Sequence, residues 1–212
     1  MFDTEKMIDI LIPTVAQGLL WALLALGVYV TFRVLALADF LVEGTFRSVS
    51  PFVASGQAYV FGMLIAFFLA AIAGALAGIV TGFFTTRLKI PALLAGILTM
   101  IGLYSVNLHV MGKANVALLR VDTIFSYAES FGMSATVAML TVGVVAAVFI
   151  GCLMYWFFGT EIGTAIRATG CNSQMARAQG VNTNRMIVLG LLISHALVPP
   201  PGALRAQYNA FV

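Results

Sequence analysis

The side chains of this sequence that could do chemistry are few and lie far apart along the chain. Cys152 falls in an apolar stretch and Cys171 in a polar one, and neither has the CxxC or Cys/His spacing of a metal or redox site. His109 and His195 have no carboxylate partner nearby in the sequence. Either histidine could relay a proton or contact a solute, but a packed or interfacial position is the favoured interpretation.

No enzyme motif connects these residues. The sequence has no Gly-x-Ser-x-Gly, HExxH or P-loop motif, and it has no pair of intramembrane aspartates of the kind that membrane proteases use. We therefore expect no catalytic residue, no metal site and no bound cofactor. An ATP site, if the protein needs one, should lie on another chain.

Three polar residues in or near apolar stretches are candidates for a translocation path. Asp39 and Glu43 lie four residues apart at the edge of an apolar run, and they could pair with Arg33 and Arg47 or face a solute path. Asn107, near the end of another apolar run, could contact a solute, cap a helix or form a hydrogen bond between helices. The sequence leaves these alternatives open.

The composition indicates which elements must position these residues. Hydrophobic residues make up 61% of the 212 residues and charged residues 9%, and the mean hydropathy is +1.04. A chain with so little polar surface needs the lipid bilayer as its solvent, and helices satisfy their own backbone there. We expect an all-α polytopic membrane protein with one transmembrane domain over residues 1–212. Its basic residues are scattered, which argues against nucleic-acid binding.

The apolar runs predict about six transmembrane or re-entrant helices. Their ranges are Ile10–Ala38, Phe40–Ala58, Tyr59–Phe84, Ile90–Met111, Met133–Phe158 and Met186–Gln207. The second run contains Glu43, Arg47 and Pro51, so we expect it to be broken and packed against protein. The start of the chain lacks the basic region and cleavage site of a signal peptide, so the first run is expected to be retained.

The short basic loops predict the orientation in the membrane. Arg87 and Lys89 follow the third run, and Arg167, Arg177 and Arg185 follow the fifth. Both loops should therefore be cytoplasmic, which puts the N-terminus outside. If the second run is re-entrant, the N-terminus is predicted on the other side.

Small residues recur at every fourth position of the third run, on one face of the predicted helix. They are Ala66, Ala70, Gly74, Gly78 and Gly82. Such a face lets another helix approach closely, which is a main source of helix association in lipid. Helix packing is the favoured interpretation, and a pore lining is the alternative.

The segment from Thr160 to Arg185 is polar and punctuated by glycines between two apolar runs. It predicts two short helices, the first capped by Gly170 and the second ended by Gly180, with Asn182 or Thr183 as the N-cap of the last run. The hairpin should display small side chains at a surface suited to docking into a groove of another protein. These side chains are Ala165, Ala168, Ala176 and Ala178.

This segment carries a resemblance to a known family. The pattern T-x-x-G-x-x-x-R-A-x-G-x-N from Thr160 to Asn172, followed by A-x-x-x-G-V-N from Ala176 to Asn182, resembles the coupling segment of ABC permeases of the branched-chain amino-acid and ribose group. The stretches Gly18–Asp39 and Leu88–Asn115 also resemble this group. The chain is most similar to the members that are paired with a lipoprotein-like solute-binding protein.

The resemblance implies the permease subunit of an ATP-driven importer in the bacterial inner membrane, for a small solute that could be amino-acid-like. It implies three partners: an ABC ATPase subunit, an extracytoplasmic solute-binding protein and a second permease copy. Residues 160–185 would be the cytoplasmic coupling segment. The coupling residues would be Glu161, Gly163, Arg167, Ala168, Gly170, Asn172, Ala176 and Gly180.

The chain departs from the family pattern in two places. Arg47 and its neighbours replace an apolar run, and Pro199, Pro200 and Pro201 replace a small apolar helical stretch. Three prolines argue against a straight sixth helix. Because the family continues for about two more spans, we expect a chain that is truncated at its C-terminus.

Two other functions remain open at this stage. One is an ion-coupled secondary transporter or channel, which would need several ionisable groups within the membrane. The other is an assembly subunit without transport.

Overall fold

The computed structural model describes residues 4–37, 60–111, 135–199 and 201–202, and the regular elements within these residues are all helices. In chain order they are α1 (Thr4–Tyr29), the π-helix η1 (Val30–Val34), α4 (Val60–Thr86), α5 (Ala92–Met111), α7 (Ala135–Gly159), α8 (Glu161–Cys171), α9 (Ser173–Ala178) and α10 (Thr183–Leu197). The second predicted run, Phe40–Ala58, lies outside the described residues, and so do Asp39 and Glu43.

Four of the described helices are long and apolar enough to cross a bilayer. Their apolar parts are Ile10–Val34, Phe68–Thr86, Ala92–His109 and Leu140–Gly159. Large apolar side chains such as Ile72, Leu98 and Phe149 are exposed on these helices, as side chains that face lipid should be. The predicted all-α polytopic membrane fold is confirmed.

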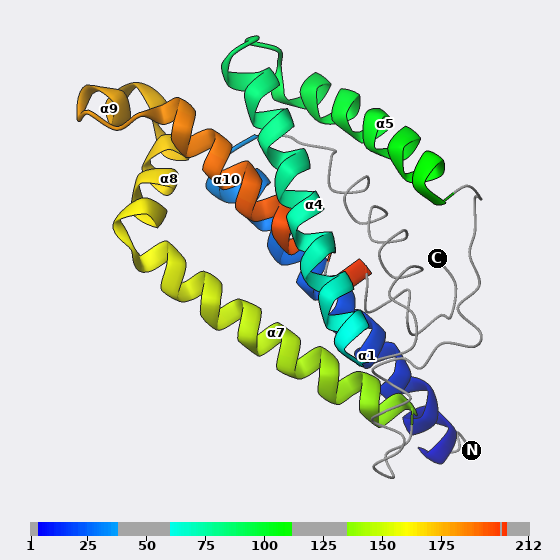
Figure 1. Cartoon of the computed structure of the whole chain (residues 1–212). Helices are drawn as coiled ribbons and strands as arrows, with labels where there is room; N and C mark the ends of the chain where they lie inside the picture. Colours follow the sequence, from blue (N-terminus) through cyan, green and yellow to red (C-terminus); the bar gives the residue numbers. More distant parts are fainter. Residues whose placement is uncertain (1–3, 38–59, 112–134, 200, 203–212) are drawn as a thin grey trace.

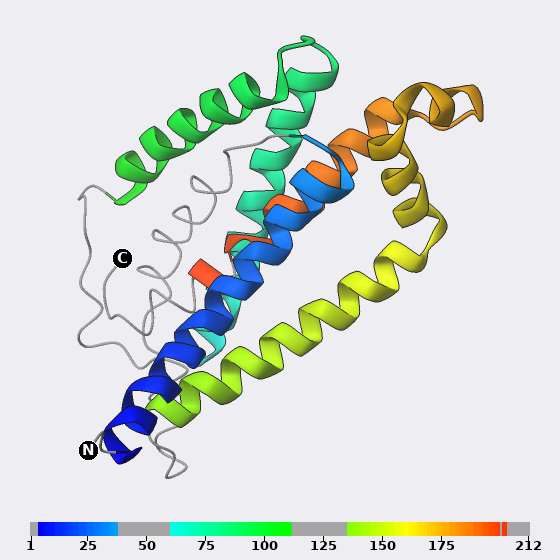
Figure 2. The same cartoon turned by 180° about the vertical axis from the view of Figure 1, so that it is seen from behind.

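The described helices place the two ends of the bundle. α1 and α4 run in the same direction, and the N-terminal end of α1 lies near the start of α7 (Figures 1 and 2). The connection from α4 to α5 and the pair α8–α9 lie together at the opposite end. The two basic loops therefore share one end, and the first helix begins at the other.

The end that carries α8 and α9 is rich in positive charge. Its basic side chains in the described residues are Arg33, Arg87, Lys89, Arg167, Arg177 and Arg185. Glu161 is the one acidic residue that the described part of the chain places there. Because positively charged loops are retained in the cytoplasm, we expect this end to be cytoplasmic. We call this end of the bundle the basic end.

α10 packs along the small-residue face of α4. A Cβ atom on Gly74 would overlap the carbonyl oxygen of His195, and one on Gly78 would lie 2.6 Å from the carbonyl oxygen of Leu191. A Cβ atom on Gly82 would lie 3.0 Å from Val188 Cγ2. Ala70 is completely buried. The glycines thus allow the backbones of α4 and α10 to approach more closely than side chains would permit.

α1 is held between α7 and α10. It packs against α7 in an apolar core formed by Ala16, Leu20, Leu23, Val30, Ile150 and Met154. On its other side, Ser194 of α10 donates a hydrogen bond from Oγ to the carbonyl oxygen of Gly27, at 2.6 Å. Gly27 has room for this contact because it lacks a Cβ atom, which would lie 3.1 Å from the carbonyl oxygen of Ser194.

α10 is short, and a bend at Val198 separates it from the helical residues Pro199, Pro201 and Gly202. α10 ends at Leu197, two residues before Pro199, although the apolar run predicts a helix to Gln207. A proline ring clashes with the preceding turn and restricts the residue before it, so the regular helix stops there. The prediction that the prolines prevent a straight sixth helix is confirmed for the described residues. Residues 203–212 lie outside them.

Two other outcomes concern single elements. The first run does not form one regular α-helix to Ala38. α1 changes into the π-helix η1, and the amide of Leu35 donates to the carbonyl oxygen of Val30 at 3.0 Å.

His195 is completely buried where α10 meets α4, whereas His109 is exposed near the end of α5. No cluster of potential metal ligands occurs among the described residues.

Candidate functional site

The helices α8 and α9 form a hairpin that projects from the basic end of the bundle (Figure 1). The hairpin begins at Thr160, which is the N-cap of α8. Its hydroxyl accepts a hydrogen bond from the amide of Gly163 at 3.3 Å and donates one to the carbonyl oxygen of Phe157 at 2.6 Å. Glu161 follows in the first turn, where its negative charge interacts favourably with the positive end of the helix dipole and stabilises the helix.

Gly163 allows the chain to turn sharply from α7 into α8. A Cβ atom at this position would overlap the carbonyl oxygen of Phe157 and lie 2.6 Å from the Cα atom of Phe158. Any larger residue would force the two helices apart. This glycine therefore sets the angle at which the hairpin leaves the membrane helix.

Asn172 connects the two short helices. Its amide donates to the carbonyl oxygen of Ala168 at 2.9 Å, which closes α8. Its side-chain oxygen accepts from the amides of Gln174 at 3.1 Å and Met175 at 3.0 Å, which begins α9. One asparagine thus satisfies backbone groups at both helix ends.

The turn after α9 follows the prediction. Gly180 has a φ of +86°, a conformation that favours glycine, and the amide of Val181 donates to the carbonyl oxygen of Ala176 at 3.1 Å. Arg177 closes the turn through a hydrogen bond of 3.0 Å from Nη2 to the hydroxyl oxygen of Thr183. Asn182 caps α10 by accepting from the amide of Arg185 at 3.2 Å. The predicted N-cap of the last run is confirmed at Asn182.

The predicted role of Gly170 as a helix cap is wrong. α8 continues to Cys171, and Gly170 lies inside it against the π-helix η1. A Cβ atom on Gly170 would overlap the carbonyl oxygen of Val34 and lie 3.0 Å from the Cα atom of Leu35. The glycine is required by a close contact between two backbones and not by the local conformation.

The inner face of the hairpin is fixed to the membrane helices. Ile166 is completely buried, and it packs with Val34 and Leu35 at the end of the first span and with Leu191 of α10. Gly163 and Thr169 are buried on the same side. α8 therefore packs directly against the end of the first span and against α10.

The outer face differs from the predicted one. Ala168 and Ala178 are exposed and Ala165 is half-buried, but Ala176 is 4% exposed. The prediction that Ala176 is displayed is wrong, because its side chain is buried within the described structure. Asn172 and Gly180 are both exposed.

Two apolar residues on the outer face were not predicted as functional. Met175 of α9 is 60% exposed and Ile162 of α8 is 52% exposed, both at the basic end and outside the apolar parts of the helices that could cross the bilayer. An exposed apolar side chain outside the membrane is a contact candidate for another protein. The sequence signal was a methionine within an otherwise polar six-residue helix.

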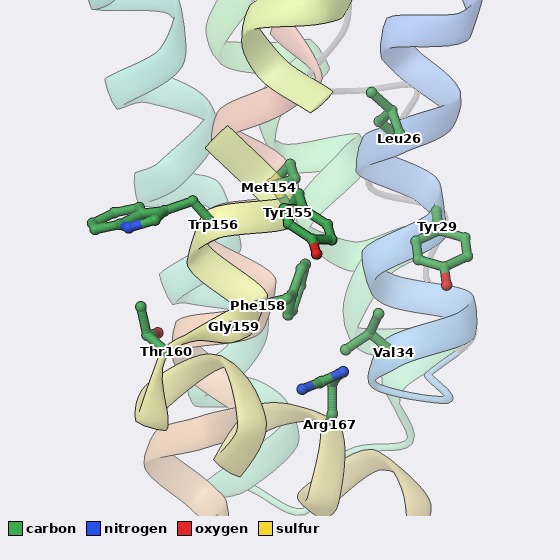
Figure 3. Close-up of a pocket in the computed structure, with 10 residues that line it drawn as sticks. All are labelled: Leu26, Tyr29, Val34, Met154, Tyr155, Trp156, Phe158, Gly159, Thr160 and Arg167. Atoms are coloured by element: carbon green, nitrogen blue, oxygen red, sulfur yellow. The ribbon is translucent and has the colours of Figure 1, made fainter. Parts of the chain in front are cut away.

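Arg167 does not share this outer face. Its side chain is exposed, but it points from α8 toward a pocket between α1 and α7, near Val34 and Phe158 (Figure 3). The structure thus separates Arg167 from Ala168 and Met175, although all three lie in the same hairpin.

Asn107 lies in a different part of the fold. It is 8% exposed near the end of α5, and its amide nitrogen has no hydrogen-bond partner among the residues that the structure describes. α5 is joined to α4 by a buried hydrogen bond of 3.0 Å between the hydroxyl groups of Thr81 and Thr99. Among the predicted site residues, the coupling candidates are brought together in one hairpin and Asn107 remains apart from them.

Comparison with known proteins agrees with the motifs. Residues 10–204 match the family described as branched-chain amino acid transport system / permease component. The chain is 35% identical over 202 residues to a tyrosine transport system permease protein of Clostridioides difficile (strain R20291). These aligned residues cover 95% of this chain and 65% of that protein. It is 30% identical over 203 residues to an uncharacterized protein of Rickettsia prowazekii (strain Madrid E). These aligned residues cover 96% of this chain and 70% of that protein.

The chain therefore spans roughly two thirds of the length of these two relatives. No solved structure matches it. The apolar helices and the family together make it a multi-pass integral membrane protein of the bacterial inner membrane. The resemblance drawn from the coupling motif is confirmed: this chain belongs to the family of branched-chain amino acid transport system permease components.

Proposed function

We propose that this chain is the permease subunit of an ATP-driven ABC importer and that residues 160–185 dock on a separate ATPase subunit. The family supports a membrane component of a transport system. The absence of a P-loop from the sequence is consistent with ATP hydrolysis on another chain. The hairpin supplies the surface through which the two subunits would meet.

The exposed apolar tip of the hairpin is the observation that carries this proposal. α9 is too short to be a stable helix alone, yet it is closed by Asn172 at one end and by Gly180 at the other. Met175 lies on this fixed helix and remains 60% exposed. A rigid apolar contact outside the bilayer suits insertion into a groove of a partner protein.

The solute is proposed to be a small amino-acid-like molecule. One relative is named for tyrosine transport, which favours this class. Two further partners belong to the proposal: a solute-binding protein on the outer side and a second permease copy. Together they would deliver the solute to a path between the two permease chains.

An ion-coupled carrier is less well supported. Such a carrier needs several ionisable side chains within the membrane. The apolar runs of the sequence contain few such groups. This composition favours energy supplied by a separate subunit.

The proposal is tested by changing the apolar tip. Met175→Glu places a charge where the partner groove would bury a thioether, so co-purification with a co-expressed ABC ATPase should fall at least tenfold. Burial of an unpaired charge is worth several kcal/mol, which makes a tenfold change a conservative threshold. Retention of the ATPase on the affinity-tagged full chain is the measurement.

Leu88→Glu is the matched control. Leu88 is 55% exposed in the connection from α4 to α5, at the same end of the molecule but away from the hairpin. This variant should retain the ATPase at the unmodified level. If both variants retain it equally, the hairpin is not the docking surface.

A further inference from the structure

A pocket of about 700 Å³ opens between the first span and the end of α7, next to the hairpin (Figure 3). Its walls come from α1, η1, α7, the N-cap Thr160 and, in α8, Arg167. The volume lies within the range of roughly 300–1,000 Å³ that is typical of small-molecule pockets. None of the predicted coupling contacts except Arg167 lines it.

The lining of this pocket is mainly apolar, with aromatic side chains on its exposed side. Leu26, Met154, Val34 and Phe158 form apolar walls within the membrane spans. Tyr29, Tyr155 and Trp156 lie at about the level of Met154, where they are 54%, 87% and 69% exposed (Figure 3). Tyrosine and tryptophan concentrate at the boundary between hydrocarbon and water, so these rings indicate that the pocket lies near the lipid headgroups.

Arg167 closes the pocket at the end nearest the hairpin, beyond Val34 and Phe158 (Figure 3). Its guanidinium group points toward the pocket from α8, on the side away from the membrane centre (Figure 3). The described residues offer it no ion-pair or hydrogen-bond partner, and Glu161, the one acidic residue at this end, does not line the pocket. An exposed guanidinium that has no partner among the described residues, beside an apolar slot, suits an amphiphile with an anionic head.

We propose that this pocket binds an anionic phospholipid of the cytoplasmic leaflet, with its phosphate on Arg167 and the upper part of an acyl chain against Leu26 and Met154. A lipid matches this pocket because its acyl chain can lie along the apolar lining while its charged head reaches Arg167 at the end nearest the hairpin. The positive charge of the basic end favours an anionic lipid over a zwitterionic one.

The bound lipid would join the hairpin to the membrane helices. Arg167 is on α8, whereas Leu26 and Tyr29 are on α1 and Met154 is on α7. A lipid that contacts all three helices would stabilise the position in which Gly170 touches Val34. The composition of the membrane would thereby influence the part of the molecule that faces the ATPase in our proposal.

Tryptophan fluorescence tests this site directly, because the sequence contains two tryptophans, Trp21 and Trp156. In the full chain with Trp21→Phe, Trp156 at the rim of the pocket becomes the single reporter. The protein is reconstituted in phosphatidylcholine vesicles that contain a small fraction of dibrominated phosphatidylglycerol or dibrominated phosphatidylcholine. Bromine quenches only nearby tryptophan, so the ratio of the two quenching efficiencies measures the preference for the anionic lipid.

We expect a preference of about fivefold for phosphatidylglycerol, which corresponds to one arginine contact near the surface. Arg167→Gln should reduce the preference to near one. Arg185→Gln is the matched control, because it removes an exposed arginine at the same end that does not line the pocket, and it should leave the preference unchanged. Arg167→Lys should give an intermediate value, since lysine keeps the charge without the planar fork.

Three outcomes would overturn the proposal. Equal quenching by both lipids in the parent protein would mean ordinary contact with surrounding lipid. An equal loss of preference in Arg167→Gln and Arg185→Gln would mean general attraction to the basic end. Protection of Trp156 from both lipids would assign the pocket to an interface between two copies of the chain. If Arg167→Gln does not fold, an unchanged preference in Arg167→Lys is the contradicting result.

Discussion

Single glycines determine how the hairpin joins the membrane helices. Gly163 lies against the carbonyl of Phe157 at the start of α8, and Gly170 lies against the carbonyl of Val34 near its end. Gly190 makes a similar close contact from α10, where a Cβ atom would lie 2.6 Å from Leu35 Cδ1. A methyl group at the two α8 positions would meet backbone atoms, which cannot move as a flexible side chain can.

Gly170→Ala should therefore separate α8 from η1. We expect a loss of about 1–3 kcal/mol in stability, the usual result of forcing a methyl group into a packed contact. Thermal unfolding of the purified chain in detergent measures this loss as a lower midpoint temperature. Gly151→Ala is the control, because nothing lies within 4 Å of its Cβ position. Equal unfolding midpoints for the two variants would show that a methyl group at position 170 does not clash with η1.

The local sequence predicts residues whose roles are local. Asn182 caps α10 and Gly180 ends α9 as expected, because both roles depend on neighbours within a few positions. Gly170 was misread, since its reason is a backbone from the first span, which is distant in the sequence. The orientations of Met175 and Ala176 could not be predicted, because a six-residue helix is too short to show a period.

At the scale of elements, the contact between α4 and α10 brings together parts of the chain that are far apart in sequence. Gly74, Gly78 and Gly82 receive the backbone of α10, and Ser194 ties α10 to α1. In lipid such close packing and interhelical hydrogen bonds replace the hydrophobic drive that assembles soluble proteins. α10 is thus joined both to the hairpin and to two membrane spans.

Gly78→Leu should disrupt this assembly. A Cβ atom alone would lie 2.6 Å from the carbonyl oxygen of Leu191, and the rest of the leucine side chain would push α10 away from α4. We expect a fall of several degrees in the unfolding midpoint and a larger aggregated fraction in size-exclusion chromatography. Leu69→Ile, at a position that is 42% exposed on the same helix, should be tolerated. An unchanged midpoint for Gly78→Leu would contradict the packing role of the glycine face.

The sequence predicts the long helices well. The runs Tyr59–Phe84, Ile90–Met111 and Met133–Phe158 correspond to α4, α5 and α7 with ends that differ by at most two residues. Length and hydropathy determine these elements almost alone. The π-helix η1 was not predicted, because no breaker residue marks it in the sequence. Val34 and the following Leu35 pack with Ile166 of α8 and Leu191 of α10, which are distant in the sequence.

At the scale of the whole molecule, charge and direction agree. The N-terminal end of α1 lies opposite the basic end (Figures 1 and 2), and the charged residues of its first two turns are Glu5, Lys6 and Asp9. The positive-inside rule then predicts a cytoplasmic hairpin and an external N-terminus. The sequence alone left the second possibility of a reversed N-terminus, which the parallel course of α1 and α4 argues against.

Thiol labelling of intact cells tests this orientation. Cys171 is exposed in the hairpin, so with Cys152→Ala it becomes a native reporter of that end. A second variant carries Cys152→Ala, Cys171→Ala and Glu5→Cys. An impermeant maleimide should label the cysteine at position 5 in intact cells but should label Cys171 only after detergent is added. Labelling of Cys171 in intact cells would place the hairpin outside.

The central claim is that ATP hydrolysis on a separate subunit, acting through the hairpin, drives uptake. Its most direct test is uptake of radiolabelled amino acids by proteoliposomes that contain the full permease, a co-expressed ABC ATPase and the solute-binding protein. We predict uptake that requires ATP on the hairpin side and that Met175→Glu combined with Ala168→Trp lowers at least tenfold, while Leu88→Glu does not. Uptake driven by a proton or sodium gradient without the ATPase, and unaffected by the hairpin substitutions, would contradict the account.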